Sequence, residues 1–276
     1  MTSPLARRAV RHVRWRLERA RRMWQILVGR GDRTVIMTPQ VGPRFGNLLY
    51  LWLAASRRSA EGRPTVVMSS PAMDEWLPVF PALRELTVEP TDLRVHDRRE
   101  WDATYGFQRF GVDFTRDSLA SFVRAHLAAH IPADRSGRLV VNVRRGDYYA
   151  EPHLRELYGF DQVAYVAAAL DRIGAVDRAL VVSDDADWCR EHLDPVLRPR
   201  VAEIEYMDPD PRANFLAVAG ASRIVGTNST FTYWAAYVAD VVHDDAVIVM
   251  PGFHSRAPAA ETAYQLDPRW TILDGF

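Results

Sequence analysis

The chain has 276 residues, 48% of them apolar and 25% charged, which is the composition of an ordinary soluble globular protein. Its 35 basic residues, all arginine, balance 35 acidic ones, and the single cysteine, Cys189, excludes an intramolecular disulfide and a cysteine-rich zinc site. No apolar run is long enough to cross a bilayer, and we expect a protein of the reducing cytoplasm.

Residues 1–33 form an arginine-rich arm. Ten arginines against Glu18 and Asp32 give this arm a net charge of +8, and apolar residues recur among them at roughly helical intervals. One interpretation is an interfacial helix that lies on anionic lipid at the inner face of the membrane. The other is a solvated helix, partly disordered, that packs one face on the body of the protein. No nucleic-acid-binding pattern follows the arm, so we expect no nucleic acid partner.

Residues 34–136 are expected to form an N-terminal lobe. The apolar pattern predicts strands over 34–38 and 65–69 and helices over 47–59 and about 118–130. Ser118 is the expected N-cap of the second helix. Between these elements, residues 71–113 are rich in proline, tryptophan and charge and show no period, so no element is predicted there.

Residues 137–276 alternate strands with helices and are expected to form a C-terminal lobe. The expected strands are 139–143, 179–183, 202–206, 223–227 and 246–250, and the expected helices are 162–173, 187–193, 212–221 and 229–239. This rhythm predicts a parallel sheet covered by helices on both faces. Ligands of such sheets bind outside the carboxyl ends of the strands, where the polar motifs of this chain lie.

The first motif ends the strand that begins at residue 139. An apolar run is followed directly by Arg144, Arg145, Gly146 and Asp147. Fixed guanidinium groups at the end of a buried strand suit a pyrophosphate, because each donates paired, charge-assisted hydrogen bonds. Adjacent side chains leave in different directions, so one arginine can face the ligand while the other pairs internally, for example with Asp147. An Arg–Asp pair that only braces the loop is the structural alternative.

The second motif, Ser183, Asp184 and Asp185, follows another apolar strand. Capping of the next helix accounts for one of the two carboxylates. The other is then left for the N–H donors of guanine or the hydroxyls of ribose. A divalent metal is a weaker interpretation, because no further acidic cluster completes an oxygen cage.

The third motif places Asn228, Ser229, Thr230 and Phe231 between a strand and a helix. Small polar residues at a helix N-terminus make an anion site, and these exceed what a helix cap requires. A fourth, weaker motif lies in the first half of the chain, where Arg44, Gly46 and Asn47 open a helix; glycine there permits close approach of the backbone to a ligand.

Taken together and in this order, the motifs resemble those of the α-1,2-fucosyltransferases of glycosyltransferase family 11. That family carries H-x-R-R-G-D-Y, a later S-D-D…W-C element and an S-N-S-T-F-x-W-W-A-A-like element, which correspond here to residues 142–148, 183–189 and 227–236. Residues 44–47 are similar to the G-R-F-G-N loop of fucosyltransferases more broadly. The resemblance extends from about residue 35 to residue 250.

The resemblance implies an α/β fold of the GT-B type, with two facing Rossmann-like lobes built on parallel sheets. It also implies that the N-terminal lobe, residues 34–136, lies on the acceptor side. It implies inverting, metal-independent transfer of fucose from GDP-fucose to a glycan hydroxyl, plausibly O-2 of a terminal galactose, with no cofactor. Arg144 would contact the β-phosphate, and Arg44, Gly46 and Asn47 would close the site from the opposite lobe. The other donor-binding residues that the resemblance implies are Asn142, Ser183, Asp184, Asp185, Asn228, Ser229, Thr230 and Phe231.

For catalysis, Arg144 is expected to stabilise the charge that develops on GDP. Four residues are candidate bases and the sequence does not rank them: Asp147, Glu151, His153 and His254. Alternatively, the donor dissociates ahead of attack and a phosphate oxygen collects the proton.

The sequence departs from the family pattern at three positions. Asn142 replaces the histidine of the first motif, Leu48 replaces glutamine and Pro43 replaces glycine. Because of Asn142, two other functions stay open: a transferase that uses another GDP-sugar such as GDP-mannose, and a non-catalytic relative that binds nucleotide or glycan.

Overall fold

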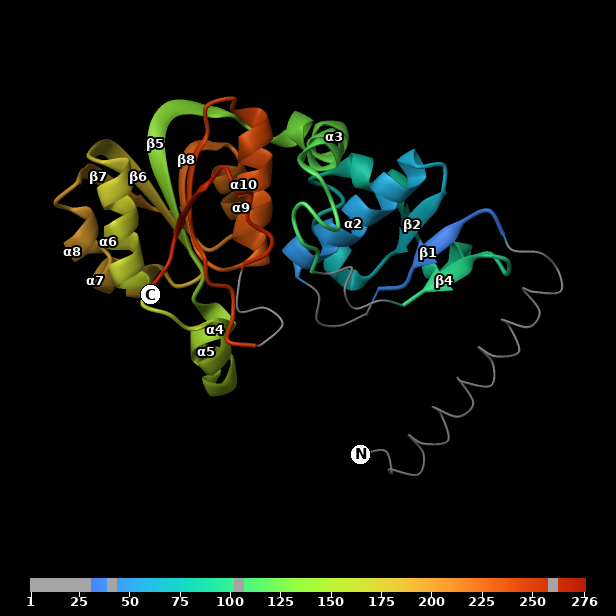
Figure 1. The fold of residues 1–276 in the computed structure, drawn as a ribbon, viewed down its shortest axis with the longest axis horizontal. Coiled ribbons are helices and arrows are strands. Elements are labelled where there is room, and N and C mark those ends of the chain that lie inside the picture. Colours follow the sequence, from blue (N-terminus) through green and yellow to red (C-terminus); the bar gives the residue numbers. More distant parts are fainter. Residues whose placement is uncertain (1–30, 39–43, 102–106, 258–262) are drawn as a thin grey trace.

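Two parallel sheets organise the chain, one in each half (Figure 1). The computed structural model describes residues 31–38, 44–101, 107–257 and 263–276. Nearly all of the arginine-rich arm lies outside the described residues, and so do Pro43 and its neighbours. The two α/β sheets agree with the GT-B arrangement that the motifs imply.

The first sheet has four strands in the order β3-β2-β1-β4. These strands are β1 (Thr34–Ile36), β2 (Thr65–Met68), β3 (Thr87–Val88) and β4 (Arg98–Glu100). Helix α2 (Phe45–Ala60) connects β1 to β2 and is buried along most of its length, because it packs on its own sheet and on the second lobe.

Short 3-10 turns fill much of the segment for which no element was predicted. They are η1 (Pro71–Met73), η2 (Pro81–Leu86) and η3 (Pro90–Asp92), and each begins at a proline. Helix α3 (Arg116–His126) follows, and then η5 (Ala128–His130). The N-cap of α3 is Thr115, and Ser118 is the N3 residue of the same capping box. The prediction of Ser118 as the N-cap is therefore wrong, although its side chain does take part in capping the helix.

The second sheet has six strands in the order β10-β9-β8-β5-β6-β7. They are β5 (Asp134–Val143), β6 (Val176–Ser183), β7 (Val201–Tyr206), β8 (Ala221–Gly226), β9 (Val247–Pro251) and β10 (Thr271–Leu273). The helices of this lobe are α4 (Gly146–Ala150), α5 (Pro152–Tyr158), α6 (Gln162–Ile173), α7 (Ala186–His192), α8 (Asp194–Leu197), α9 (Pro211–Ala219) and α10 (Thr230–Val242).

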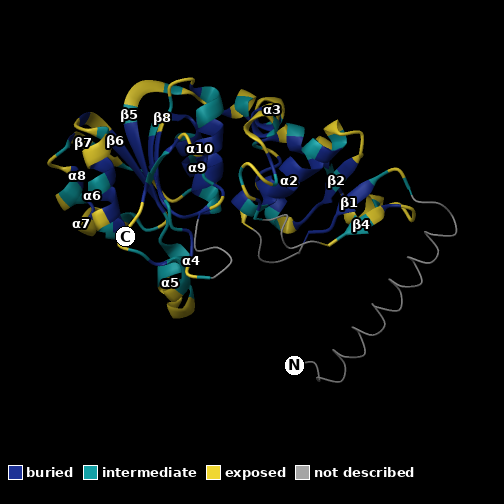
Figure 2. Cartoon of the chain, viewed as in Figure 1, coloured by how far each residue is buried: buried dark blue, intermediate teal, exposed yellow. Residues whose placement is uncertain are grey.

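Helices cover both faces of the second sheet, as predicted. Along β5, Val140 packs in the cluster that contains α9 and α10, whereas Leu139 and Val141 pack in the cluster that contains α6, α7 and α8. This alternation is the two-residue period of a strand with two buried faces. Figure 2 shows the resulting dark band of buried strands between the helical layers.

The order of strands reverses beside β5. From β5 the chain proceeds to β6 and β7 on one side, and β8, β9 and β10 lie on the other side. The carboxyl ends of β5 and β8 therefore border the crevice where open α/β sheets bind ligands. β5 begins at Asp134, ahead of the predicted lobe boundary at residue 137, and its register with β8 is irregular between Asp134 and Leu139.

The two lobes meet along α2 and α10. The ring centroids of Tyr50 and Trp234 lie 5.0 Å apart, and those of Phe45 and Phe215 lie 4.9 Å apart. At Gly46 the two backbones lie in contact: an added Cβ would lie 2.5 Å from the carbonyl carbon of Thr230. Glycine is required there because the start of α2 rests directly on the start of α10.

Candidate active site

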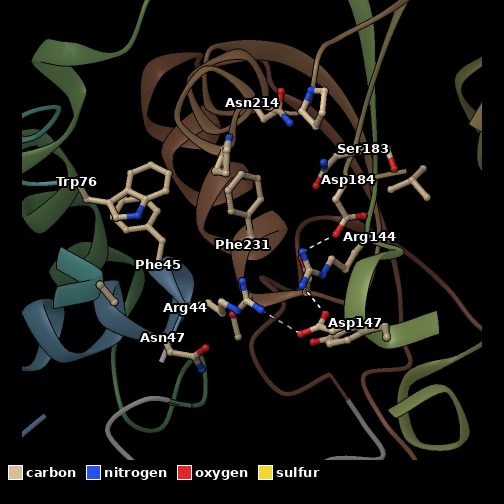
Figure 3. Close-up of a pocket in the computed structure, with 18 of the residues that line it drawn as sticks. Arg44, Phe45, Asn47, Trp76, Arg144, Asp147, Ser183, Asp184, Asn214 and Phe231 are labelled. Carbon is tan, nitrogen blue, oxygen red and sulfur yellow. Dashed lines mark hydrogen bonds and ion pairs between the residues drawn. The ribbon is translucent and has the colours of Figure 1, made fainter. Parts of the chain in front are cut away.

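A cavity of about 370 Å³ opens between the two lobes at the end of β5 (Figure 3). Residues at or just beyond the carboxyl ends of β5, β6, β7 and β8 form one wall, and the start of α2 with the turn after β2 forms the other. The cavity is lined by ten of the residues that the sequence singled out: Arg44, Asn47, Asn142, Arg144, Asp147, Ser183, Asp184, Ser229, Thr230 and Phe231.

Arg144 is held between two carboxylates at the carboxyl end of β5. Its Nη1 lies 2.5 Å from Asp184 Oδ2, and its Nη2 donates to Asp147 Oδ1. Asp147 Oδ2 also accepts from Arg44 Nη2 at 3.4 Å, which links the two lobes. The Arg144 side chain stays 26% exposed, so the cation is fixed in direction and still borders the cavity. A guanidinium held in this way is preorganised to donate hydrogen bonds to phosphate oxygens.

Arg145 does not line the cavity and lies between two aromatic rings. Its guanidinium carbon is 3.7 Å from the ring centroid of Tyr149 and 3.7 Å from that of Trp188. Burial lowers the pKa of this arginine. The two arginines do face different environments, but the expected partner is wrong: Asp147 pairs with Arg144, and Arg145 stacks on Tyr149 and Trp188.

The two adjacent carboxylates after β6 have separate roles. Asp184 bonds Arg144 and also accepts from the backbone N–H of Arg145 at 2.7 Å. Gly146 allows this approach, because its φ is +24° and a Cβ there would overlap Asp184 Oδ2. Asp185 is the N-cap of α7 and does not line the cavity. The structure therefore brings Asp184, and not Asp185, to the candidate site.

Asn142 lines the cavity and joins three elements. Its Nδ2 donates to the carbonyl of Val182 in β6 at 3.0 Å, and its Oδ1 accepts from Thr232 Oγ1 in α10 at 2.6 Å. Thr232 Oγ1 lies 2.8 Å from Ser229 Oγ. The side chain that stands in place of the family histidine is thus bonded within the protein at both ends of its amide.

The N-terminus of α10 borders the cavity from the second lobe. Ser229 is its N-cap and accepts from the N–H of Thr232 at 3.2 Å. Thr230 and Phe231 form the first turn and line the cavity. First-turn N–H groups lack partners within a helix, and the positive end of the helix dipole attracts anions.

The first-lobe wall of the cavity is aromatic. Phe45 stacks on Trp76 with ring centroids 3.5 Å apart and planes within 3° of parallel. Figure 3 shows this pair on the side of the cavity opposite Arg144. Apolar ring faces beside a few fixed polar groups are typical of a site for a small organic ligand.

Several predicted site residues lie outside the cavity lining. Gly46 permits the contact between α2 and α10, as described above. Asn228 is fully buried, and its Nδ2 donates to the carbonyls of Tyr158 and His254 at 2.9 and 2.8 Å. Asn228 therefore holds the loop behind the cavity.

Of the four candidate bases, Asp147 lines the cavity, and Glu151, His153 and His254 do not. His254 is 5% exposed, its Nδ1 lies 3.0 Å from Tyr233 Oη, and burial lowers its pKa to about 4. A neutral, buried imidazole outside the cavity is a structural group.

The structure adds lining residues that the motifs did not include. They are Ala72, Glu75 and Trp76 after β2, and Pro209, Pro211 and Asn214 at the start of α9. Both groups follow the carboxyl end of a strand. Ligands of parallel sheets bind outside the carboxyl ends of the strands, and this rule located the three motifs. Applied to every strand, and not only to strands that end in polar runs, it would have indicated these residues as well.

Comparison with known proteins decides the family. The family model "Glycosyl transferase family 11" matches residues 103–273, more than half of the chain. The chain belongs to glycosyl transferase family 11. The match covers the second lobe as far as the end of β10, including Arg144, Asp184 and the start of α10.

Curated relatives of this family 11 chain include two monkey enzymes. "Galactoside alpha-(1,2)-fucosyltransferase 1" of Alouatta belzebul is 30% identical over 131 residues, which are 46% of this chain and 36% of the relative. The protein of the same name from Aotus azarae is 31% identical over 152 residues, 54% of this chain and 37% of the relative. The matched region thus spans little more than a third of each relative's length.

Solved structures similar to this family 11 chain include POFUT1 in complex with GDP-fucose and the E. coli heptosyltransferase WaaC with ADP. The first has a TM-score of 0.46 at 11% identity and covers 81% of this chain and 98% of that chain. The second has a TM-score of 0.44 at 10% identity and covers 88% and 93%.

Two negative findings concern the described part of this family 11 chain. Nowhere in it do three His, Cys, Asp or Glu side chains gather closely enough to hold a metal ion. None of its helices is both long and apolar enough to span a membrane.

Proposed function

We propose that this protein is an inverting fucosyltransferase that transfers fucose from GDP-fucose to a hydroxyl of a glycan, at O-2 of a terminal galactose. The observation that carries the proposal is that Arg144 and the start of α10 lie on the same wall of the cavity, in a chain that belongs to family 11. The names of the curated relatives support the transferred sugar and the linkage.

The chemistry requires stabilisation of the leaving group. Transfer breaks the bond from C1 of fucose to the β-phosphate oxygen, and GDP departs with new negative charge. Arg144 and the first turn of α10 border the same cavity before the donor arrives, so they need little reorganisation. Asp147 and Asp184 keep the guanidinium in place, and Arg44 adds a second cation from the opposite lobe.

The remaining groups suit the nucleoside. Ser183, Asp184 and Asn214 supply polar atoms on the second-lobe side of the cavity, which fits the hydroxyls of ribose or the N–H donors of guanine. Phe45 and Trp76 present ring faces from the first lobe, which fits the apolar face of a sugar or a base.

Ligand-induced thermal stabilisation tests the donor. GDP and GDP-fucose are expected to raise the melting temperature, and UDP-sugars are not. GDP-mannose is the matched comparison, since it shares the nucleotide and differs in the sugar. A larger shift with GDP-mannose than with GDP-fucose would favour the alternative donor, and no preference for GDP ligands contradicts the proposal.

Transfer to N-acetyllactosamine tests the reaction and the linkage. The expected product carries α-linked fucose on O-2 of galactose, assigned by NMR. The 2-deoxygalactose analogue of the acceptor is the control, because it lacks the reacting hydroxyl. Fucosylation of that analogue contradicts the O-2 assignment. Absence of both transfer and slow GDP-fucose hydrolysis would favour a non-catalytic relative.

Two further proposals concern conditions. We place the reaction in the cytoplasm and without a metal, so transfer should be unchanged by EDTA. The predicted contact of the arm with anionic membrane rests on residues 1–33 alone and is tested by co-sedimentation of the full chain with phosphatidylserine vesicles.

A further inference from the structure

Three carboxylates line the cavity, and one of them differs from the others. Asp147 and Asp184 both bond Arg144. Glu75 accepts a hydrogen bond from Trp76 Nε1 at 3.0 Å, and within the described part of the chain no arginine or histidine pairs with it. Glu75 is also exposed to solvent. Of the three cavity carboxylates, Glu75 is therefore the one that no described guanidinium engages.

Glu75 also lies on the appropriate wall. The groups that would hold the leaving phosphate, Arg144 and the start of α10, belong to the second lobe. In an inverting displacement the acceptor oxygen attacks C1 from the face opposite the leaving group, which is the side of the first lobe. Glu75 follows β2 and η1 in that lobe.

No other described residue on the first-lobe wall can serve as a base. The others are Arg44, Phe45, Asn47, Ala72 and Trp76. The arginine stays protonated, and the remaining side chains do not titrate in the required range. Asp147 lies on the second-lobe wall, and its two carboxylate oxygens are engaged by the guanidinium groups of Arg144 and Arg44.

We infer that Glu75 is the catalytic base, which accepts the proton of the acceptor hydroxyl as the new glycosidic bond forms. The inference rests on the proposed function. The acceptor oxygen bonds to C1, the C1–O bond to the β-phosphate breaks, and GDP leaves with that electron pair. The acceptor proton moves to a carboxylate oxygen of Glu75.

The surroundings of Glu75 suit this role. The charged groups that share the cavity are Arg44 at the start of α2, Arg144 after β5, Asp147 in α4 and Asp184 after β6. Each aspartate is paired with Arg144, so the cavity does not present two bare negative charges to Glu75. Trp76 Nε1 occupies one carboxylate oxygen, and the other, Oε2, makes no hydrogen bond to a described residue.

The last titratable group of the lining, Tyr148, is excluded as a base. Burial raises the pKa of this phenol above its usual value of 10.0. It stays protonated where the enzyme would operate and adds no charge to the cavity.

The test compares Glu75→Gln with Asp74→Asn, an exposed neighbour that does not line the cavity. With N-acetyllactosamine as acceptor, Glu75→Gln should lower kcat by at least about 100-fold, the usual scale of general base catalysis. Its Kd for GDP and its melting temperature should match those of the wild type. The acidic limb of the pH profile of kcat/KM should disappear. Asp74→Asn should change none of these quantities.

Glu75→Asp provides a second variant, since it keeps a carboxylate at shorter reach. It should retain the acidic limb at reduced kcat. Wild-type kcat in Glu75→Gln, or an acidic limb that survives in it, overturns the inference and leaves the proposed function intact. A wild-type protein that binds GDP and transfers to no galactoside contradicts the proposed activity, and this inference with it.

Discussion

Arg144 and Asp184 form an ion pair of 2.5 Å between the carboxyl ends of β5 and β6. The strands pair in parallel with Val143 opposite Ser183, so the residues that follow each strand meet directly. Asp184 also receives the backbone N–H of the next arginine, Arg145. The pair therefore fixes both the charge of Arg144 and the turn from which it projects.

Replacement of Arg144 by alanine should abolish transfer and leave the fold intact. A loss of about 100-fold or more in kcat is expected, because a preorganised donor to the leaving phosphate is removed. Asp147 and Asp184 lose their partner but are 34% and 29% exposed, so water can solvate them and the melting temperature should fall only slightly. Transfer assays and thermal denaturation measure the two effects.

Arg138→Ala is the matched control for this variant. Arg138 lies on the same strand and pairs with Asp134 at 2.7 Å, away from the cavity. Wild-type transfer in Arg138→Ala and retained transfer in Arg144→Ala together would refute the role of Arg144.

The second sheet could be predicted from the sequence because its strands are short apolar runs and its helices have clear periods. Helix α6 has the predicted bounds, since Asp161 caps it and Gly174 ends it. β5 begins earlier than predicted, because its first residues are mostly exposed and polar and carry no hydrophobic signal. β10, also short, gave no signal that could be separated from a loop.

The site could be predicted in part. Strand ends located Arg144, Asp184 and Ser229, since parallel topology brings such ends together. The partners of each side chain depend on contacts between distant segments, and the stacking of Arg145 on Trp188 is one of them. On the first-lobe wall, Arg44 and Asn47 were predicted, but Trp76 was missed, because it lies in an aperiodic segment and is positioned by its stacking on Phe45.

Arg145→Lys should destabilise the fold, since lysine lacks the planar group that stacks between Tyr149 and Trp188. Loss of two cation–π contacts at a largely buried site should lower the free energy of unfolding by about 1–3 kcal/mol. Urea denaturation measures this difference. Arg155→Lys is the control, because that guanidinium is exposed and 6.0 Å from the Tyr149 ring. Equal stability of the two variants would contradict the structural role.

Gly46→Ala should separate the lobes and weaken donor binding. The new methyl would meet the backbone of Thr230, which cannot move aside as a side chain can. A loss of about 1–3 kcal/mol in stability is expected from such overpacking, with a weaker Kd for GDP. Gly62→Ala is the comparison: it has open space but a φ of +78°, so it should lose stability without changing GDP affinity. Calorimetric titration with GDP distinguishes them.

Asn142→Ala should lower stability and leave nucleotide preference unchanged. It removes the side-chain donor to the Val182 carbonyl and one of the two partners of Thr232 Oγ1, which keeps Ser229 Oγ, and an unsatisfied buried group costs about 1–3 kcal/mol. Thr232→Val should lower the free energy of unfolding less in the Asn142→Ala variant than in the wild type, because the hydrogen bond between the two side chains is already lost in that variant. The ratio of Kd values for GDP and ADP is the second measurement. A changed ratio would mean that Asn142 contacts the base directly.

His254 gives the protein a pH dependence of stability. Burial lowers its pKa to about 4 in the folded state, against 6.5 as its ordinary value. Between these values the unfolded chain binds the proton and the folded chain does not. The contribution of His254 to the free energy of unfolding is therefore fully present above about pH 6.5. It decreases by about 3 kcal/mol in all as the pH falls toward 4.

His254→Gln should remove that part of the pH dependence. Glutamine cannot titrate, and its amide oxygen can still accept a hydrogen bond from Tyr233 Oη, the present partner of His254 Nδ1. At about pH 7 the variant should have a lower free energy of unfolding than the wild type, because packing is lost. This gap should narrow at about pH 5, because only the wild type is destabilised by burying a neutral imidazole that the unfolded chain would protonate. Urea denaturation at both pH values measures the gap. The exposed His153→Gln is the control, and a gap that stays constant with pH in His254→Gln would contradict a buried neutral imidazole.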